Sequence, residues 1–115
     1  MLLRSLMCES LKRSTQVVNE VPVDKKFKER VEVRTFCNCR EQGYHIRISG
    51  KSGSIDCLNL WFSENRNSDQ MVLYECHGYV DGLTEEAWKD ADYYNSVEEI
   101  VMEITKRIET YLEEN

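Results

Sequence analysis

Cysteine and histidine are the residue types in this chain with the widest chemical range. The 115 residues include five cysteines and two histidines. Cys37 and Cys39 are two residues apart, so on a β-strand both thiols would point to the same face. Two thiolates on one face could share a metal ion with side chains from neighbouring strands. The residues that could complete such a site are Cys57, Cys76, His45 and His77.

A structural role for the thiols is the stronger prediction. Structural zinc sites usually draw their ligands in pairs two to four residues apart on turns, and the chain contains no Cys-x-x-Cys motif. Free cysteine is also among the most often buried residue types, and it packs as a small hydrophobic side chain. We therefore expect no metal and no cofactor. A Cys-ligated metal or redox module remains the alternative.

The sequence gives even less support for other catalytic sites. Cys76 and His77 are adjacent, so on a strand their side chains would point to opposite faces. Cys57 and His45 could meet across a hairpin, but no third group is evident to orient the histidine. Residues 50–54 contain glycine, lysine and serine but lack the spacing of a phosphate-binding loop. The sequence therefore predicts a protein that is not an enzyme.

Charge is distributed unevenly along the chain. Residues 1–60 contain eleven Lys/Arg against seven Asp/Glu, and residues 61–115 contain four against fourteen. The net charge is −6 and the isoelectric point is near 5.0. This balance argues against direct binding to nucleic acid or to an anionic membrane, because both require a dominant positive surface. An acidic half of the molecule instead suits a partner with a basic surface.

Composition and length predict one domain over residues 1–115, in a reducing, cytoplasmic compartment. The odd number of cysteines favours free thiols. The opening residues do not have the pattern of a signal peptide. No apolar run approaches the roughly 20 residues that a membrane-spanning helix needs.

The first thirty residues contain apolar patterns typical of helices and others typical of extended strands. Leucines and methionines at three- and four-residue spacing predict an amphipathic helix over residues 2–13. Residues 16–23 are apolar enough for a short strand, and Pro22 would limit it to a sheet edge. Asp24 is placed to cap a helical turn over the basic residues 25–30, which would otherwise form a solvated loop.

The middle of the chain alternates with period two, which is typical of β-strands. Short turns between the segments predict an antiparallel meander of four strands. Residues 55–62 are apolar on both faces and should lie in mid-sheet. The four expected strands are residues 31–39, 44–48, 55–62 and 71–80.

Two helices should follow the strands, which makes the expected fold α+β. Thr84 can cap a short helix that runs to about Asp92. Residues 96–99 have the spacing of a capping box, and they open a long amphipathic helix that should cover one face of the sheet. Its apolar arc consists of Val97, Ile100, Val101, Ile104, Ile108, Tyr111 and Leu112.

The acidic and aromatic stretch over residues 81–99 is the strongest candidate for a function. Tyr and Trp are frequent anchors of protein interfaces, and clustered carboxylates complement basic patches. The leading hypothesis is a small acidic interaction module that binds a basic surface of another protein. It could inhibit that protein by mimicking nucleic-acid charge, as do antagonists of similar size and charge from phages and mobile elements. The alternative in the same class is an assembly or secretion-type chaperone that binds an apolar segment. The predicted partner-binding residues are Glu85, Glu86, Trp88, Asp90, Asp92, Tyr93, Tyr94 and Glu98.

Overall fold

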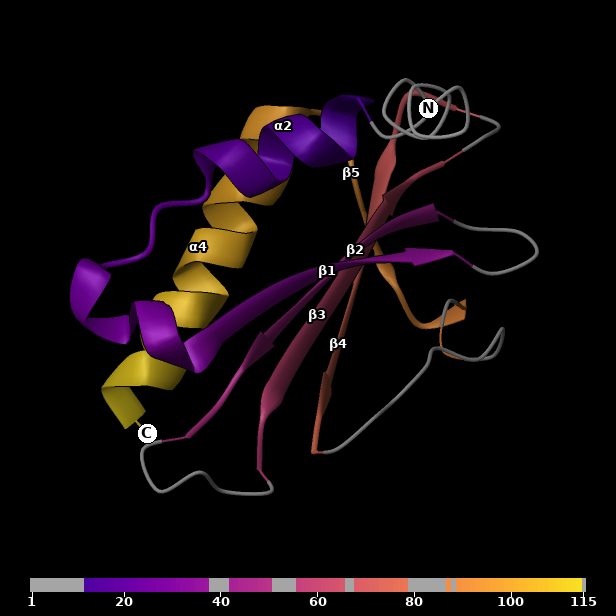
Figure 1. Cartoon of the computed structure of the whole chain (residues 1–115). Helices are drawn as coiled ribbons and strands as arrows, with labels where there is room; N and C mark the ends of the chain where they lie inside the picture. The colour runs from indigo at the N-terminus through magenta and orange to yellow at the C-terminus, as the bar shows by residue number, and fades with distance from the viewer. Residues whose placement is uncertain are drawn as a thin grey trace.

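The chain folds into one antiparallel sheet with helices on one of its faces (Figure 1). The computed structural model describes residues 12–37, 42–50, 56–65, 68–78, 87 and 89–114. The predicted α+β class is confirmed, with a long C-terminal helix packed on the sheet. In chain order the elements are α2 (Lys12–Glu20), the 3-10 helix η1 (Lys25–Arg30), β1 (Val31–Cys37), β2 (Gln42–Ile48), β3 (Leu58–Glu64), β4 (Met71–His77), β5 (Asp92–Tyr94) and α4 (Val97–Glu114).

Within the described residues the sheet has five strands, one more than predicted. Their order is β1-β2-β3-β4-β5, and each strand is antiparallel to the next. The added strand is β5, in which Tyr94 pairs with Met71 and Asp92 pairs with Leu73. The helix predicted from Thr84 to about Asp92 lies mostly outside the described residues; Ala87 and Lys89 are helical, and the helix ends before Asp92, which belongs to β5. Three residues are too few to show an alternating pattern, so the sequence offered no strand signal here.

The first described helix also corrects the predicted boundaries. The predicted helix over residues 2–13 lies largely outside the described residues, and the chain is helical over Lys12–Glu20. The strand predicted over residues 16–23 is therefore wrong. Ser14 and Val17 are three residues apart and both buried, which is the spacing of one helical face. The helix ends just before Pro22, and Asp24 then caps η1 by accepting a hydrogen bond from the backbone of Lys26 at 3.1 Å.

The long helix α4 matches its prediction. Ser96 caps its first turn, where Ser96 Oγ accepts from the backbone N–H of Glu99 at 3.2 Å. Glu99 in turn accepts from the backbone N–H of Asn95 at 3.1 Å, which is close to the predicted capping box. Val97 and Val101 pack at the margin of the core. The rest of the predicted arc is fully or almost fully buried: Ile100, Ile104, Ile108, Tyr111 and Leu112.

The two faces of the sheet follow from strand alternation. Leu58, Leu60 and Phe62 of β3 are buried beneath the helices, and we call this side the helical face. Asn59, Trp61 and Ser63 point to the other side and are also buried. The prediction that this central strand is covered on both faces is therefore confirmed.

Gly43 fixes the alignment of β2 against β3. It lies opposite Ser63 in the register. A Cβ atom at Gly43 would collide with the backbone carbonyl group of Phe62. Only glycine, which has no side chain, allows the two backbones to approach this closely.

Among the described residues, no helix is both long enough and apolar enough to span a membrane.

Candidate protein-binding surface

The predicted acidic and aromatic residues are divided among several positions. Asp90 is exposed shortly before β5, and Glu98 is exposed in the first turn of α4. Tyr93 is 55% exposed, and it pairs with Val72 on the side of the sheet away from the helices. The predicted residues that lie outside the described part of the chain are Glu85, Glu86 and Trp88.

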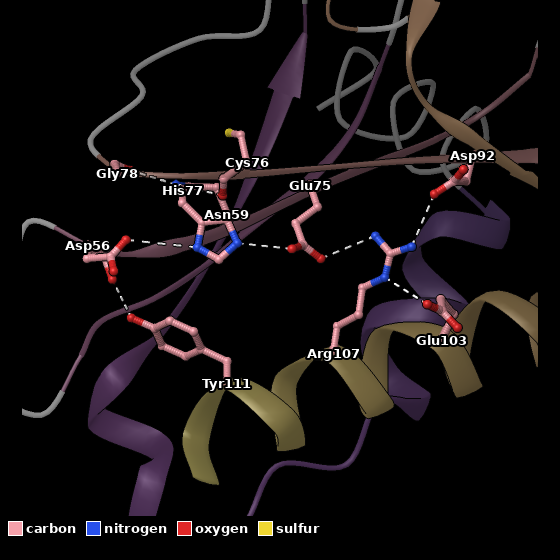
Figure 2. A network of polar contacts seen from close by, with 10 residues as sticks. All are labelled: Asp56, Asn59, Glu75, Cys76, His77, Gly78, Asp92, Glu103, Arg107 and Tyr111. Carbon is pink, nitrogen blue, oxygen red and sulfur yellow. Dashed lines mark hydrogen bonds and ion pairs between the residues drawn. The ribbon is translucent and has the colours of Figure 1, made fainter. Parts of the chain in front are cut away.

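The other two predicted residues, Asp92 and Tyr94, contact Arg107, and Figure 2 shows the contact with Asp92. Arg107 Nη2 donates to Asp92 Oδ2 at 3.1 Å and to the hydroxyl of Tyr94 at 3.3 Å. The same guanidinium donates through Nε to Glu103 at 2.8 Å, and its Nη1 lies 3.3 Å from a carboxylate oxygen of Glu75. Arg107 therefore joins β4, β5 and α4. Asp92 and Tyr94 help to hold the short strand β5 against the helix.

The electrostatics of this cluster agree with a structural role. Burial by itself would lower the pKa of Arg107, but the hydrogen bonds to Glu103 and Asp92 outweigh it and leave the pKa raised. Burial raises the pKa of the Tyr94 hydroxyl, and the nearby Arg107 charge opposes part of that effect. Arg107 thus stays charged and Tyr94 stays neutral at physiological pH.

A second polar chain continues from Glu75 toward the other end of α4. His77 Nε2 lies 3.0 Å from Glu75 Oε2, and His77 Nδ1 lies 3.9 Å from a carboxylate oxygen of Asp56. The Tyr111 hydroxyl donates to the backbone carbonyl of Asp56, and burial raises the pKa of Tyr111. Figure 2 shows the Cys76 thiol pointing away from the His77 ring, as the alternation of strand residues predicts. The histidine therefore faces two carboxylates and no nucleophile in this part of the structure.

Glu75, His77 and Tyr111 line a groove of about 210 Å³ between β4 and α4. Its walls carry both signs of charge, with Glu75 and Glu103 close to Lys106 and Arg107. Glu114 is a third acid in this lining, and the acids nearest to Arg107 are already bound to it, so the groove presents only a small excess of negative charge to a ligand.

The far side of the sheet carries a polar cluster that the sequence analysis missed. His45 is 5% exposed, and its ring stacks on Trp61 with centroids 3.7 Å apart and 4° between the planes. Asn59 Oδ1 accepts from Arg47 Nε at 3.1 Å and lies 2.9 Å from His45 Nε2, so this ring nitrogen acts as the donor. Asn59 Nδ2 donates to the carbonyl of Gly78 at 2.7 Å. The sequence did contain one signal for this cluster, because Asn59 is a polar residue within the most apolar strand.

Burial shifts the pKa of two groups on this far side. It lowers the pKa of His45, although the hydrogen bond with Asn59 acts in the opposite direction. It raises the pKa of the Cys76 thiol, so this cysteine is protonated rather than a thiolate. The Cys76 thiol is therefore not activated as a nucleophile, and the His45 ring is kept neutral.

The structure describes three of the four cysteines in the candidate metal site. Cys37, Cys57 and Cys76 form no disulfide bonds, and Cys39 lies outside the described residues. Strand alternation places Cys37 and Cys76 on opposite faces of the sheet. In the described part of the chain, no three His, Cys, Asp or Glu side chains are grouped so that they could hold a metal ion.

The solvent side of α4 forms an acidic face, which we define as Glu98, Glu109 and Glu113 around Met102. At 100° per residue these four positions fall within about 60° of the helix circumference. The three carboxylates are exposed and make no hydrogen bond or ion pair with the described residues. Met102 is 73% exposed, and it lies between Glu98, four residues before it, and the exposed Lys106, four residues after it.

A cleft adjoins the C-terminal end of this acidic face. It has a volume of about 420 Å³ and lies between the segment Pro22–Phe27 and the last turns of α4. Phe27, Ile108 and Leu112 supply its apolar lining. Glu109 and Glu113 belong both to the cleft and to the acidic face. The cleft therefore combines an apolar floor with three acids, Asp24, Glu109 and Glu113, and one base, Lys26, whose ammonium lies over the Phe27 ring.

Comparison of the chain with protein families, with curated proteins and with solved structures found no match.

Proposed function

We propose that this chain is a protein-interaction module that binds a basic segment of another protein. The acidic face of α4 attracts Lys and Arg side chains of that segment. The adjoining cleft receives an apolar side chain between them. The observation that carries the proposal is that Glu109 and Glu113 form the rim of an apolar cleft and also continue the acidic face.

The charge of α4 supports attraction of a basic partner. The helix contains six Glu against one Lys and one Arg. Arg107 is paired with Glu103, Glu75 and Asp92, so its charge is largely compensated within the molecule. The acidic face keeps its carboxylates unpaired within the described structure. Surplus charge of this kind acts mainly on the rate of association and fades as salt screens it.

The cleft supports a sequence preference in addition to charge. Interfaces gain most of their binding free energy from a few apolar side chains that fill pockets, with polar groups at the rim. Phe27 and Leu112 provide such a pocket floor, and Asp24 adds a third acid to its lining. A Leu or Met between Arg or Lys residues is the complementary ligand.

A finer form of the proposal concerns inhibition. If the basic partner surface is a nucleic-acid-binding groove, the same carboxylates would occupy phosphate positions and exclude nucleic acid by competition. Displacement of a labelled oligonucleotide from the captured partner would distinguish this antagonist from an interaction module that leaves nucleic-acid binding unchanged.

A defined peptide tests the core of the proposal. The probe is a synthetic peptide with one Leu between two pairs of Arg, followed by NMR of the isotopically labelled protein. We expect shift changes at Phe27, Glu109 and Leu112, and affinity that falls as salt is added. Peptides with Ser for Leu, or with Glu for every Arg, are the controls. Equal binding of the acidic peptide, or shift changes confined to another surface, would contradict the proposal.

A pair of matched variants tests the location of binding. Glu109→Lys combined with Glu113→Lys should weaken peptide binding at low salt by about tenfold or more, because attraction becomes repulsion. Glu20→Lys combined with Glu29→Lys changes the net charge equally at exposed sites that do not line the cleft. This control should bind the peptide within about twofold of the unmodified protein. If both variants lost peptide binding equally, the effect would depend on overall charge alone, and the proposed location would be contradicted.

A further inference from the structure

The outer edge of β1 is an open strand edge. Among the described strands, β1 pairs only with β2 and lies at one end of the sheet order, and its seven residues make it longer than the three-residue strand at the other edge. Positions 32–35 are all exposed, and Val33 is 46% exposed, which is unusual for a β-branched apolar residue in a sheet. An exposed strand edge of this kind is a template for pairing with another strand.

The hydrogen-bonding direction of each residue follows from the register. The backbone N–H of Ser49 donates to the carbonyl of Arg30 at 2.9 Å, which makes Arg30 and Ser49 a hydrogen-bonded pair at the start of the β1–β2 ladder. Hydrogen-bonded pairs alternate along an antiparallel ladder, so Glu32 and Arg34 also direct their backbone groups toward β2. Val33 and Thr35 therefore direct theirs outward. The backbone N–H of Val31 is already used, because it donates to Lys28.

The charges along this edge are self-complementary. Glu32 and Arg34 flank Val33 and lie 2.8 Å apart in an exposed ion pair on one face. If a second β1 strand runs antiparallel with Val33 opposite Val33, Glu32 of each copy lies opposite Arg34 of the other. These are non-hydrogen-bonded positions, where opposing side chains approach most closely.

We infer that two copies of this chain associate by pairing β1 with β1 antiparallel about a two-fold axis at Val33. The ladder has four backbone hydrogen bonds, two between the Val33 residues and one from each Thr35 N–H to the carbonyl of the other Val31. Two Glu32–Arg34 cross-strand pairs flank it. This pairing is separate from the acidic face and the cleft of α4, so it stands independently of the proposed function.

A second copy fits this edge better than an unrelated strand does. A two-fold axis requires that the same surface complement itself, and the order Glu-Val-Arg does so only with the apolar residue on the axis. The exposed Val33 side chains then cover one another. Because the ladder covers only residues 31–35, the interface is small and the association should be reversible.

Charge-reversal variants test the pairing. Analytical ultracentrifugation of the unmodified protein should show a reversible monomer–dimer equilibrium. Glu32→Arg alone and Arg34→Glu alone should each weaken self-association by about tenfold or more, because like charges then face each other twice. Mixing the two variants should restore association as a heterodimer, which native mass spectrometry resolves. The double variant Glu32→Arg/Arg34→Glu should dimerise like the unmodified protein.

Two further measurements locate the interface. The amides of Val33 and Thr35 should become more protected from hydrogen exchange as concentration rises, whereas the amides of Glu32 and Arg34 should be protected at every concentration. Val33→Pro removes an outward N–H without breaking the β1–β2 ladder, so it should fold and remain monomeric. A protein that stays monomeric up to about 1 mM would overturn the inference. So would a dimer that persists in Val33→Pro, or a failure of the mixed variants to associate.

Discussion

The two faces of the sheet are buried by different means. On the helical face, Leu60 and Phe62 pack against α4 through apolar contacts that have no preferred direction. On the far face, Asn59, His45 and Trp61 are equally buried but depend on hydrogen bonds and ring stacking of defined geometry. Apolar packing tolerates substitutions that conserve volume, whereas a buried hydrogen bond leaves a costly unpaired group when either partner is lost.

The two faces therefore contribute differently to the stability of the fold. The helical face provides most of the driving force for folding, because most of the buried apolar side chains belong to the core beneath the helices. The far face contributes directional contacts that favour one arrangement of β2, β3 and the residues after β4. Four tests, ordered from the largest expected effect to the smallest, examine this division.

Ile104→Asp should unfold the protein. Ile104 is fully buried at the centre of the apolar arc of α4, and the substitution places an unpaired carboxylate there at a cost of several kcal/mol. Circular dichroism and thermal melting would show the loss. Met102→Asp is the control on the exposed side of the same helix, and it should leave the melting temperature nearly unchanged. A folded Ile104→Asp protein would mean that α4 is not the main cover of the sheet.

Asn59→Leu and Leu60→Met compare the two faces at adjacent positions. Asn59→Leu keeps a similar volume but removes the partners of His45 and of the Gly78 carbonyl, so we expect a loss of about 2 kcal/mol or more. Leu60→Met conserves volume beneath the helices and should cost less than about 1.5 kcal/mol. Urea denaturation measures both. If Leu60→Met proved the more damaging, the distinction between the faces would fail.

Ser96→Ala measures how much α4 depends on a directional contact of its own. The change removes the side-chain acceptor for the N–H of Glu99 and should lower the free energy of unfolding by about 1 kcal/mol. Ser96→Asp restores an acceptor and should recover most of the loss. A loss as large as that of Asn59→Leu would show that the helical face also relies on specific hydrogen bonds.

The smallest effect we expect is a pH dependence that originates on the far face. Burial lowers the pKa of His45, so the folded state holds this ring neutral. As the pH falls below about 6.5, the unfolded chain binds a proton on this residue before the folded chain does. The stability contribution is therefore complete at neutral pH and declines as the pH falls. His45→Gln should flatten the part of the stability profile between pH 7 and 5 that belongs to this ring, and an unchanged slope would contradict the assignment.

The sequence predicted the elements that have long regular patterns. The arc from Ile100 to Leu112 has helical spacing over four turns, and the strands of the meander alternate with period two, so local pattern and final burial agree. The correct strand order followed from short connections between neighbouring strands.

The predicted secondary structure was wrong where the sequence pattern is short or where tertiary contacts determine whether a segment is helix or strand. Val17 and Val18 have β-branched side chains that favour a strand, yet Val17 belongs to α2 because it packs into the core. The strand β5 has three residues and depends on β4 for pairing and on Arg107 for side-chain contacts. No local pattern records such contacts.

The candidate site was predicted in its charge but not in its geometry. The excess of acidic residues after position 60 indicated an acidic half of the molecule. The cleft could not be foreseen, because it brings Phe27 together with Leu112 from the other end of the chain. The cluster of Asn59 and His45 likewise depends on the register of β2 against β3.

The close approach at Gly43 has a consequence for tracing the ancestry of this fold. Most positions on a sheet can exchange residue types while the backbone stays in place, so remote relatives lose recognisable similarity. Position 43 lacks that freedom, because any side chain there would collide with the backbone of β3. Relatives that keep this alignment of strands should therefore retain a glycine at the start of their second strand, however far the rest of the sequence has diverged. This glycine can therefore serve as a reference position when remote sequences are aligned.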